Sequence, residues 1–305
     1  MENGMEDPVI FPNRISNSAM KSAYPMQKIQ DWLTQQWVII CGRKIDPTQF
    51  SWLIGPFGNP CLIGDNFINE LAAKENLIIV REEITTGLIP TINSLNLSEI
   101  ERSTLSAQVI DFYENTSRYT LHFKVKWNPL FKFFGVLISR LFSHRLRQLN
   151  IPTTNSKSFD ELNSELISLA DPVNNVVKYT FWLRSIKSSG QPVYSGIYGI
   201  STLPSGKTCI KAVFPLPNGN ATVLMTPAVG ENGEMVLESS GKKFGDAGFY
   251  FLLKDAKGNF RAKYVRSFHD RLMVRCNNGS LSAQQVLTLW KMEVMRFYYK
   301  MDQKH

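Results

Sequence analysis

Residues 207–229 read KTCIKAVFPLPNGNATVLMTPAV, which is two apolar runs of strand length joined by a loop that contains Asn218-Gly219. An Asn-Gly pair supplies the positive φ angles that tight hairpins require. Further Asn-Gly pairs between apolar runs occur at Asn232-Gly233 and Asn278-Gly279. The three pairs predict hairpin tips between antiparallel neighbours, and therefore an antiparallel meander.

Working outward from this hairpin, apolar runs separated by glycine-containing turns predict eight strands from residue 176 on. They are Val176–Ser185, Val193–Thr202, Lys207–Phe214, Ala221–Val229, Met235–Ser239, Gly248–Lys254, Arg261–Arg275 and a run from Leu281 onward. Upstream, Arg118–Trp127 (RYTLHFKVKW) alternates apolar and polar residues, which is typical of a half-buried strand. Residues 282–301 fit either a helix or two buried strands, because their types favour a helix and their apolar density also suits strands.

Two helices are expected between the first strand and the meander. Asn128–Asn150 (NPLFKFFGVLISRLFSHRLRQLN) has an N-cap asparagine, proline at the first helical position and a broad apolar stripe. Arg140, Arg145 and Arg147 flank that stripe, so the helix either packs on the sheet or lies in an anionic membrane surface. We favour packing on the sheet. A short helix is also expected at Phe159–Ala170.

Charge divides the chain into two parts. Residues 1–115 carry eight Lys/Arg against fourteen Asp/Glu, a net charge of −6, whereas residues 116–305 carry a net charge of +14. We expect a mixed, mainly helical region 1–115 that packs by charge attraction on an antiparallel-sheet domain 116–305. The four scattered cysteines, with no signal-peptide pattern and no long apolar run, predict a cytoplasmic protein.

Motifs for cofactors and metals are incomplete. Ser205-Gly206-Lys207-Thr208 matches half of a phosphate-binding loop, but Ser201 stands where the first glycine is required. The histidines show no His-x-x-x-His pair and the cysteines no Cys-x-x-Cys pair. We therefore expect neither a cofactor nor a metal ion.

The residues that could act on a ligand are few. His269 and Tyr264 are the candidates for catalysis, with His269 as a general base if it faces the concave side of the sheet. Asp270 cannot readily orient His269, because neighbours on a strand point to opposite faces. Loop and basic residues are the candidates for ligand binding, since binding loops lie at sheet ends. These are Arg140, Phe214, Asn218, Phe244 and Arg266.

The order of elements resembles the helix-grip architecture of START and Bet v 1-like proteins. The matching parts are Arg118–Trp127, Asn128–Asn150 and Val176 to Arg275, about two thirds of the chain. The resemblance implies an α+β fold, in which a curved antiparallel meander wraps an amphipathic helix around a cavity for lipid-like molecules. A lipocalin-like barrel is the competing fold.

The function expected from these features is non-catalytic binding of a hydrophobic or amphipathic, lipid-like small molecule between sheet and helix. The alternatives are an enzyme on the same scaffold, such as a cyclase or dehydratase, and a peripheral protein that binds anionic membranes. An anionic small molecule or an anionic membrane surface would suit the basic domain. Nucleic acid is not the expected partner, because the chain has no recognised binding module. The sequence leaves the oligomeric state open.

Overall fold

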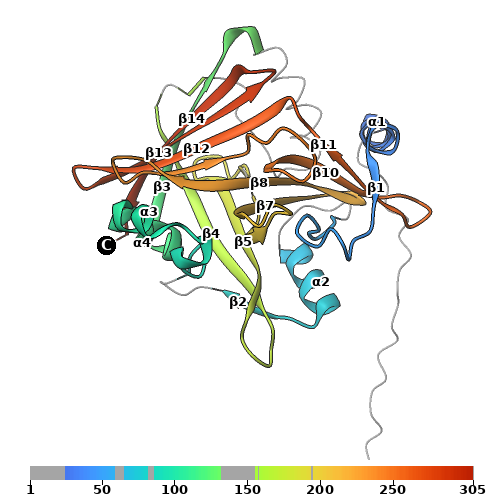
Figure 1. Ribbon diagram of the computed structural model, residues 1–305, viewed down its shortest axis with the longest axis horizontal. Helices are drawn as coiled ribbons and strands as arrows, with labels where there is room; N and C mark the ends of the chain where they lie inside the picture. Colours follow the sequence, from blue (N-terminus) through green and yellow to red (C-terminus); the bar gives the residue numbers. More distant parts are fainter. Residues whose placement is uncertain are drawn as a thin grey trace, which may run out of the picture.

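Ten antiparallel strands close into a barrel in the computed structural model (Figure 1). The structure describes residues 25–58, 65–81, 86–131, 155–156, 158–193 and 195–304, with side chains from residue 32 onward. The barrel strands are β3 (Tyr119–Trp127), β4 (Asp160–Ala170), β5 (Val177–Ile186), β6 (Gly196–Thr202), β7 (Thr208–Leu216), β8 (Gly219–Val229), β9 (Met235–Glu238), β12 (Phe268–Asn277), β13 (Ser280–Leu289) and β14 (Met292–Gln303). Their order is β8-β7-β6-β5-β4-β3-β14-β13-β12-β9, and β9 pairs with β8 again.

Four more strands are attached to the barrel wall. They are β1 (Arg43–Ile45), β2 (Ile78–Arg81), β10 (Gly248–Lys254) and β11 (Phe260–Tyr264). Strand β8 makes the branch, because residues 219–224 pair with β10 and residues 226–229 pair with β9. Beside the branch, Phe249 of β10 meets Phe268 of β12 with ring centroids 5.1 Å apart. Aromatic side chains thus fill the place where β10 leaves the barrel wall.

The three Asn-Gly pairs are hairpin tips, as the sequence predicts. They connect β7 to β8, β8 to β9, and β12 to β13, and each pair of strands is antiparallel. Asn218 and Asn278 adopt left-handed conformations with φ of 60° and 49°, and Gly233 has φ of 74°. Asparagine and glycine tolerate this region better than other residues, which explains their place at the tips.

The predicted α+β helix-grip fold is wrong, and the barrel alternative is the one that fits. The resemblance implies a helix wrapped by the sheet, but residues 282–301, which fit either a helix or two buried strands, form most of β13 and β14. Strand β14 pairs with β13 on one side and β3 on the other, which closes the sheet on itself. Ladders on both sides outweigh the helix-favouring residue types of this segment.

The helix expected at Phe159–Ala170 is also a strand, β4. Its two faces are both buried, which hides the alternation that marks an ordinary strand. Leu162 and Leu166 belong to the cluster inside the barrel, whereas Ile167 and Leu169 pack on the outside with helix α2 (Asp65–Glu75). A segment buried on both faces cannot be told from a buried helix by periodicity alone.

Most of the expected helix Asn128–Asn150, including Arg140, lies outside the described residues. Its first residues are described and begin as the sequence predicts. A short 3₁₀ helix spans η3 (Pro129–Phe131), and the side chain of Asn128 accepts a hydrogen bond from the Leu130 amide at 3.1 Å. Whether the apolar stripe packs on the sheet or faces a membrane remains a prediction.

Residues before 115 contribute to the barrel and its surroundings. The 3₁₀ turn η1 (Ile92–Leu95) and helices α3 (Glu99–Thr104) and α4 (Ala107–Glu114) lie beside the barrel strands, and the 3₁₀ turn η2 (Thr116–Arg118) follows α4 and leads into β3. Leu88, Phe112 and Tyr113 belong to the same buried cluster as the inward side chains of the barrel. A capping box of Ser98 and Glu101 begins α3. The division into regions 1–115 and 116–305 stays a prediction.

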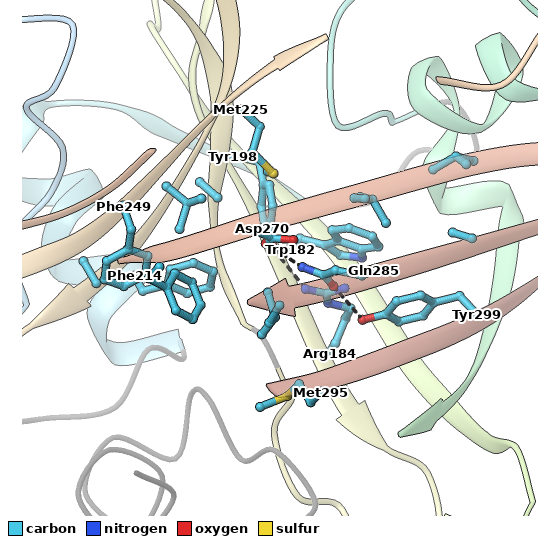
Figure 2. Close-up of a pocket in the computed structure, with 18 of the residues that line it drawn as sticks. Trp182, Arg184, Tyr198, Phe214, Met225, Phe249, Asp270, Gln285, Met295 and Tyr299 are labelled. Carbon is cyan, nitrogen blue, oxygen red and sulfur yellow. Dashed lines mark hydrogen bonds between the residues drawn. The ribbon is translucent and has the colours of Figure 1, made fainter. Parts of the chain in front are cut away.

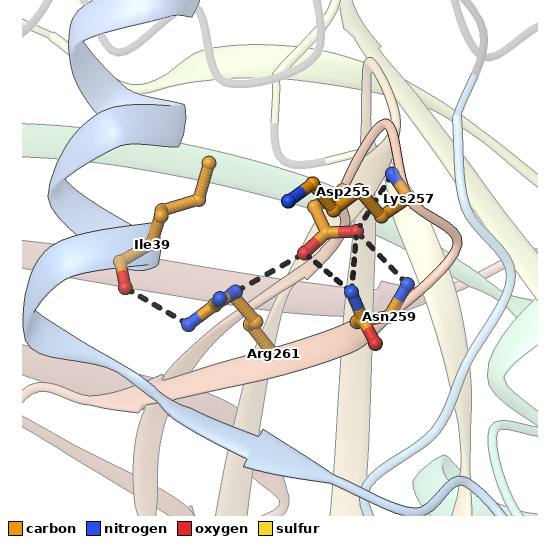
Figure 3. A network of polar contacts seen from close by, with 5 residues as sticks. All are labelled: Ile39, Asp255, Lys257, Asn259 and Arg261. Carbon is orange, nitrogen blue, oxygen red and sulfur yellow. Dashed lines mark hydrogen bonds and ion pairs between the residues drawn. The ribbon is translucent and has the colours of Figure 1, made fainter.

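Helix α1 (Pro25–Cys41) packs against β10 and β11, outside the barrel. Arg261 of β11 holds the helix by donating a hydrogen bond from Nη1 to the Ile39 carbonyl at 3.0 Å (Figure 3). The Nε of the same arginine contacts the Asp255 carboxylate at 3.3 Å. The Arg261 side chain therefore connects the Asp255 carboxylate of the β10–β11 turn with the end of α1.

Candidate functional site

The interior of the barrel contains a cavity of about 340 Å³. Its wall is built from inward-facing residues at every second position of the strands, because successive side chains alternate between the two faces. Phe112 and Tyr113 of α4 also contribute. The strand residues on the wall include Trp127, Trp182, Tyr198, Phe214, Ala221, Met225, Phe268, Leu272, Ala283, Leu287, Met295 and Tyr299. Most of this surface is apolar, which suits the hydrophobic part of a small molecule.

Among the described residues, five polar side chains meet in this apolar wall (Figure 2). They come from five strands, and most are joined in pairs by hydrogen bonds. Arg184 donates from Nη2 to the Tyr198 hydroxyl at 3.0 Å. Gln285 donates from Nε2 to Asp270 Oδ2 at 2.7 Å, and Tyr299 donates from its hydroxyl to Gln285 Oε1 at 3.3 Å. We call these five residues the polar cluster: Arg184, Tyr198, Asp270, Gln285 and Tyr299.

Arg184 places a cation inside the barrel, where it is only 7% exposed. Its Cζ lies 3.9 Å from the centroid of the Trp182 ring, so the guanidinium rests on an aromatic face. The Trp182 indole is fixed in turn, because its Nε1 donates to Ser164 Oγ at 2.8 Å. The position of the charge is therefore defined by an aromatic ring on one side and a phenol oxygen on the other.

Asp270 is the second ionisable group of the cluster, and it is also 7% exposed. Burial raises the pKa of its carboxyl group to about 7, and the hydrogen bond from Gln285 opposes that rise. Its Oδ2 accepts the Gln285 bond, but among the described residues no donor reaches its Oδ1. A buried acceptor without a partner costs free energy, so this oxygen is a place where a bound molecule can contribute a donor.

The tyrosines of the cavity stay neutral near pH 7. Burial raises the pKa of Tyr198, and it raises the pKa of Tyr299 and of Tyr113 further. Among these groups, Asp270 alone has a pKa near neutrality, so its carboxyl changes charge in the physiological range.

Of the predicted site residues that the structure describes, Phe214 is the one that lines this cavity. His269 precedes Asp270 on β12 and so points to the opposite face, where its Nδ1 lies 3.1 Å from the Ser239 carbonyl oxygen. Tyr264 packs against a second buried cluster, the outer cluster, which includes Leu53, Leu203, Tyr250 and Ala262. Its hydroxyl donates to the Gly241 carbonyl at 2.6 Å. The two candidates for catalysis are thus separated from the polar cluster.

The other predicted binding residues are dispersed. Asn218 forms the β7–β8 tip, Phe244 packs in the outer cluster under Arg43, and Arg266 is exposed between β11 and β12. Arg140 lies outside the described residues. The structure does not bring these residues together around the cavity, and their roles stay predictions.

The polar cluster itself was missed by the sequence reasoning, although one signal was present. Asp270, Leu272 and Val274 follow one another at alternate positions of β12, and all three line the cavity. A carboxylate on the apolar face of a strand marks a buried polar position. The other members of the cluster lie on strands far apart in the sequence, so their meeting depends on the closure of the barrel.

The part of the chain that the structure describes contains neither a metal-binding cluster nor a membrane-spanning helix. No three His, Cys, Asp or Glu side chains of these residues are grouped so that they could hold a metal ion. No helix there has both the length and the apolar character needed to cross a bilayer.

Comparison with known proteins gives one informative similarity. The chain resembles an uncharacterized membrane protein, YndJ, of Bacillus subtilis (strain 168), with 23% identity over 190 residues. These residues are 62% of this chain and 33% of YndJ, so the match covers about a third of the relative's length. No protein-family model matches the chain, and no solved structure matches it.

Proposed function

We propose that the barrel binds an amphipathic, lipid-like molecule in its cavity and does so next to a membrane. The observation that carries the binding proposal is the cavity, an apolar space of about 340 Å³ with one polar cluster in its wall. Sites for small molecules are typically concave, mainly apolar and 300–1,000 Å³ in volume, with a few polar groups that fix orientation.

The apolar wall supports a hydrophobic body for the ligand. Aromatic rings of Phe214, Phe249 and Phe268 contribute to one part of the wall, and methionine and leucine side chains to others. Moving apolar surface from water into such a space contributes about 25 cal/mol per Å². The polar cluster supports a polar head, because buried groups that keep hydrogen-bonding capacity discriminate against ligands without a matching group.

The membrane part of the proposal draws on the comparison and on one surface feature. YndJ is named a membrane protein, which favours the membrane alternative over a carrier that works away from membranes. At one end of the barrel, Leu130, Trp290 and Met292 are 84%, 60% and 48% exposed. Leu289 and Val294, on either side of the β13–β14 tip, line the cavity. This exposed apolar tip would let a ligand pass between a bilayer and the cavity.

The tip also carries charge that suits an anionic surface. Lys291 lies at the turn itself, and the exposed Arg266 is next to Ser267, whose carbonyl accepts a hydrogen bond from the Trp290 amide at 2.8 Å. Basic residues beside exposed tryptophan are typical of segments that lie in a membrane interface. A location on the cytoplasmic side remains part of the proposal, on the strength of the scattered cysteines.

The binding proposal is tested with the neutral fluorescent probe N-phenyl-1-naphthylamine and two variants of strand β8. Ala221 lines the cavity, whereas Ala228 on the same strand is exposed. Ala221→Phe fills part of the cavity, so we expect it to weaken probe binding about tenfold or more, while Ala228→Phe leaves binding unchanged. Equal binding by both variants and the wild type, or no saturable binding by any of them, would contradict the proposal.

The membrane proposal has a test of its own, sedimentation with vesicles that contain phosphatidylglycerol. Leu130→Ser with Trp290→Ser should release the protein from the vesicles, and added salt should weaken wild-type binding. Val173→Ser is the control, because Val173 is 90% exposed in the β4–β5 turn at the other end of the barrel (Figure 1). Wild-type protein that stays in the supernatant at low salt would contradict the membrane proposal.

A further inference from the structure

Several buried polar atoms of the cavity wall have hydrogen-bonding capacity that the described residues do not use, among them the Tyr113 hydroxyl of α4, and two of them lie together. Asp270 Oδ1 is an acceptor without a donor. The Tyr198 hydroxyl oxygen accepts from Arg184 Nη2 at 3.0 Å, which leaves its own proton to be donated. Figure 2 shows both side chains reaching the same part of the cavity, beside Trp182 and Arg184. The wall thus offers one acceptor and one donor at the same place.

From this pair we infer that the head group of the ligand is a hydroxyl, which donates to Asp270 Oδ1 and accepts from the Tyr198 hydroxyl. The inference rests on the proposed function and specifies its ligand as a hydrophobic alcohol. A hydroxyl has one donor and two acceptor lone pairs, so a single group of minimal size satisfies both atoms. Each satisfied atom removes the cost of a buried polar group without a partner.

Other common head groups match the pair less well. A carboxylate only accepts, so it would satisfy Tyr198 and bring a negative charge against Asp270. An ammonium only donates, so it would satisfy Asp270, leave the Tyr198 proton unused and face the buried cation of Arg184. The guanidinium of Arg184 is already stacked on Trp182 and bonded to Tyr198. Its role is therefore to orient the Tyr198 phenol, and it does not offer an isolated positive charge to an anionic head group.

The head group should also set the pH dependence of binding. The polar and titratable groups that line the cavity together with Asp270 are Arg184 from β5, Tyr198 from β6, Gln285 from β13, Tyr299 from β14 and Tyr113 from α4. Burial keeps the tyrosines neutral, so Asp270 is the group that changes charge between pH 6 and pH 8. An alcohol that donates to the carboxylate stabilises its ionised form, so its affinity rises as pH rises through about 7. A carboxylate ligand would show the opposite slope.

The experiment compares decanol, decanoate and decylamine, which share a chain and differ in the head group. Binding to the full-length wild-type protein at pH 6 and pH 8 is followed by calorimetry and by the fluorescence of Trp127 and Trp182, both on the cavity wall. We expect decanol to bind about tenfold more tightly than either charged ligand at pH 8, and several-fold more tightly at pH 8 than at pH 6.

Three variants test which residues set the affinity for decanol and its pH dependence. Tyr198→Phe should weaken decanol binding about tenfold, and Asp270→Asn should flatten its pH dependence. His269→Gln is the control, because its side chain lies on the opposite face of β12 beside Ser239. It should leave both the affinity and the pH profile as in the wild type.

The outcomes separate this inference from the proposed function. Tight decanoate binding that strengthens toward pH 6, a preference for decylamine, or equal affinities for all three ligands would overturn the hydroxyl and leave a binding cavity in place. Absence of binding by every ligand and by the neutral probe would overturn both. The ranking and the pH slope of the wild type decide the matter even if a variant fails to fold.

Discussion

Two aspartates of this protein, Asp270 in the barrel wall and Asp255 in the β10–β11 hairpin, have opposite surroundings. Asp255 Oδ1 accepts hydrogen bonds from the Lys257 amide at 3.0 Å and the Asn259 amide at 2.9 Å, and Oδ2 contacts Arg261 Nε at 3.3 Å (Figure 3). Asp270 has one hydrogen bond to its Oδ2 and none to its Oδ1 from the described residues.

The pKa values of the two carboxyl groups follow from this difference. Burial alone would raise the pKa of Asp255, but the hydrogen bonds from Asn259, Arg261 and Lys257 hold it below its ordinary value. Burial raises the pKa of Asp270 to about 7, and one hydrogen bond does not offset it. A carboxylate whose oxygens are all used supports its own turn, whereas one with an unused oxygen in a cavity is available to a ligand.

The largest expected effect is on the pH dependence of stability. Because the pKa of Asp270 is raised in the folded state, that state keeps its proton when the unfolded chain has lost it, and stability falls as pH rises from about 4 to 7. Asp270→Asn removes this loss, so from pH 4.5 to 6.5 it should gain about 2–3 kcal/mol relative to the wild type. Urea unfolding at several pH values measures the difference.

The contribution of Asp255 to the pH dependence of stability has the opposite sign. The pKa of Asp255 is lowered, so its contribution is present above the ordinary pKa and lost as pH falls below about 4. Asp255→Asn should therefore run parallel to the wild type from pH 4.5 to 6.5. If the stability curve of Asp270→Asn were also parallel to that of the wild type, burial would not raise the pKa of Asp270. The proposed difference between the two aspartates would then be contradicted.

A smaller effect is expected when tyrosine hydroxyls are removed inside and outside the cavity. The Tyr264 hydroxyl donates to the Gly241 carbonyl at 2.6 Å, a short bond within the outer cluster, whereas the Tyr299 hydroxyl donates to Gln285 at 3.3 Å. Tyr264→Phe should lower the free energy of unfolding by about 1–2 kcal/mol and Tyr299→Phe by about 0.5 kcal/mol. Thermal unfolding gives both values, and a larger loss for Tyr299→Phe would assign a structural role to the cavity group.

The smallest expected effect is local. Asp255→Ala removes one partner of Arg261, whose Nη1 donates to the Ile39 carbonyl at the end of α1. Backbone amides of α1 and of the β10–β11 hairpin should then exchange hydrogen faster, because local opening needs fewer contacts to break. Strands β12 and β13 should be unaffected. Hydrogen exchange that changes in the barrel instead would show that the hairpin supports the cavity.

Much of the sheet could be predicted from the sequence because the information there is local. An Asn-Gly pair fixes a turn within two residues, and period-two alternation identifies strands such as β3 without reference to the rest of the chain. Strand β4 and residues 282–301 could not be read this way. The end of β4 is buried on both faces, residues 282–301 combine helix-favouring residue types with a high apolar density, and the pairing partners of both segments are set by the closure of the barrel.

The candidate site was harder to predict, for the same reason. Arg184, Asp270 and Tyr299 are separated by many residues, and only the barrel register turns their side chains to one point. Residues that look functional in the sequence, such as His269 beside Asp270, alternate to the outer face. Shifting the register of β12 by one residue would turn His269 into the barrel and Asp270 outward, so the site depends on tertiary structure.

The most direct test of the central claim, that the barrel holds an amphipathic molecule, is native mass spectrometry of the purified protein. We expect a complex with one small molecule per chain, which is released on denaturation and extracts into organic solvent. The complex should be lost in Ala221→Phe, where the cavity is filled, and kept in Ala228→Phe. A wild-type mass equal to that of the bare chain, unchanged after incubation with a hydrophobic alcohol, would contradict the account.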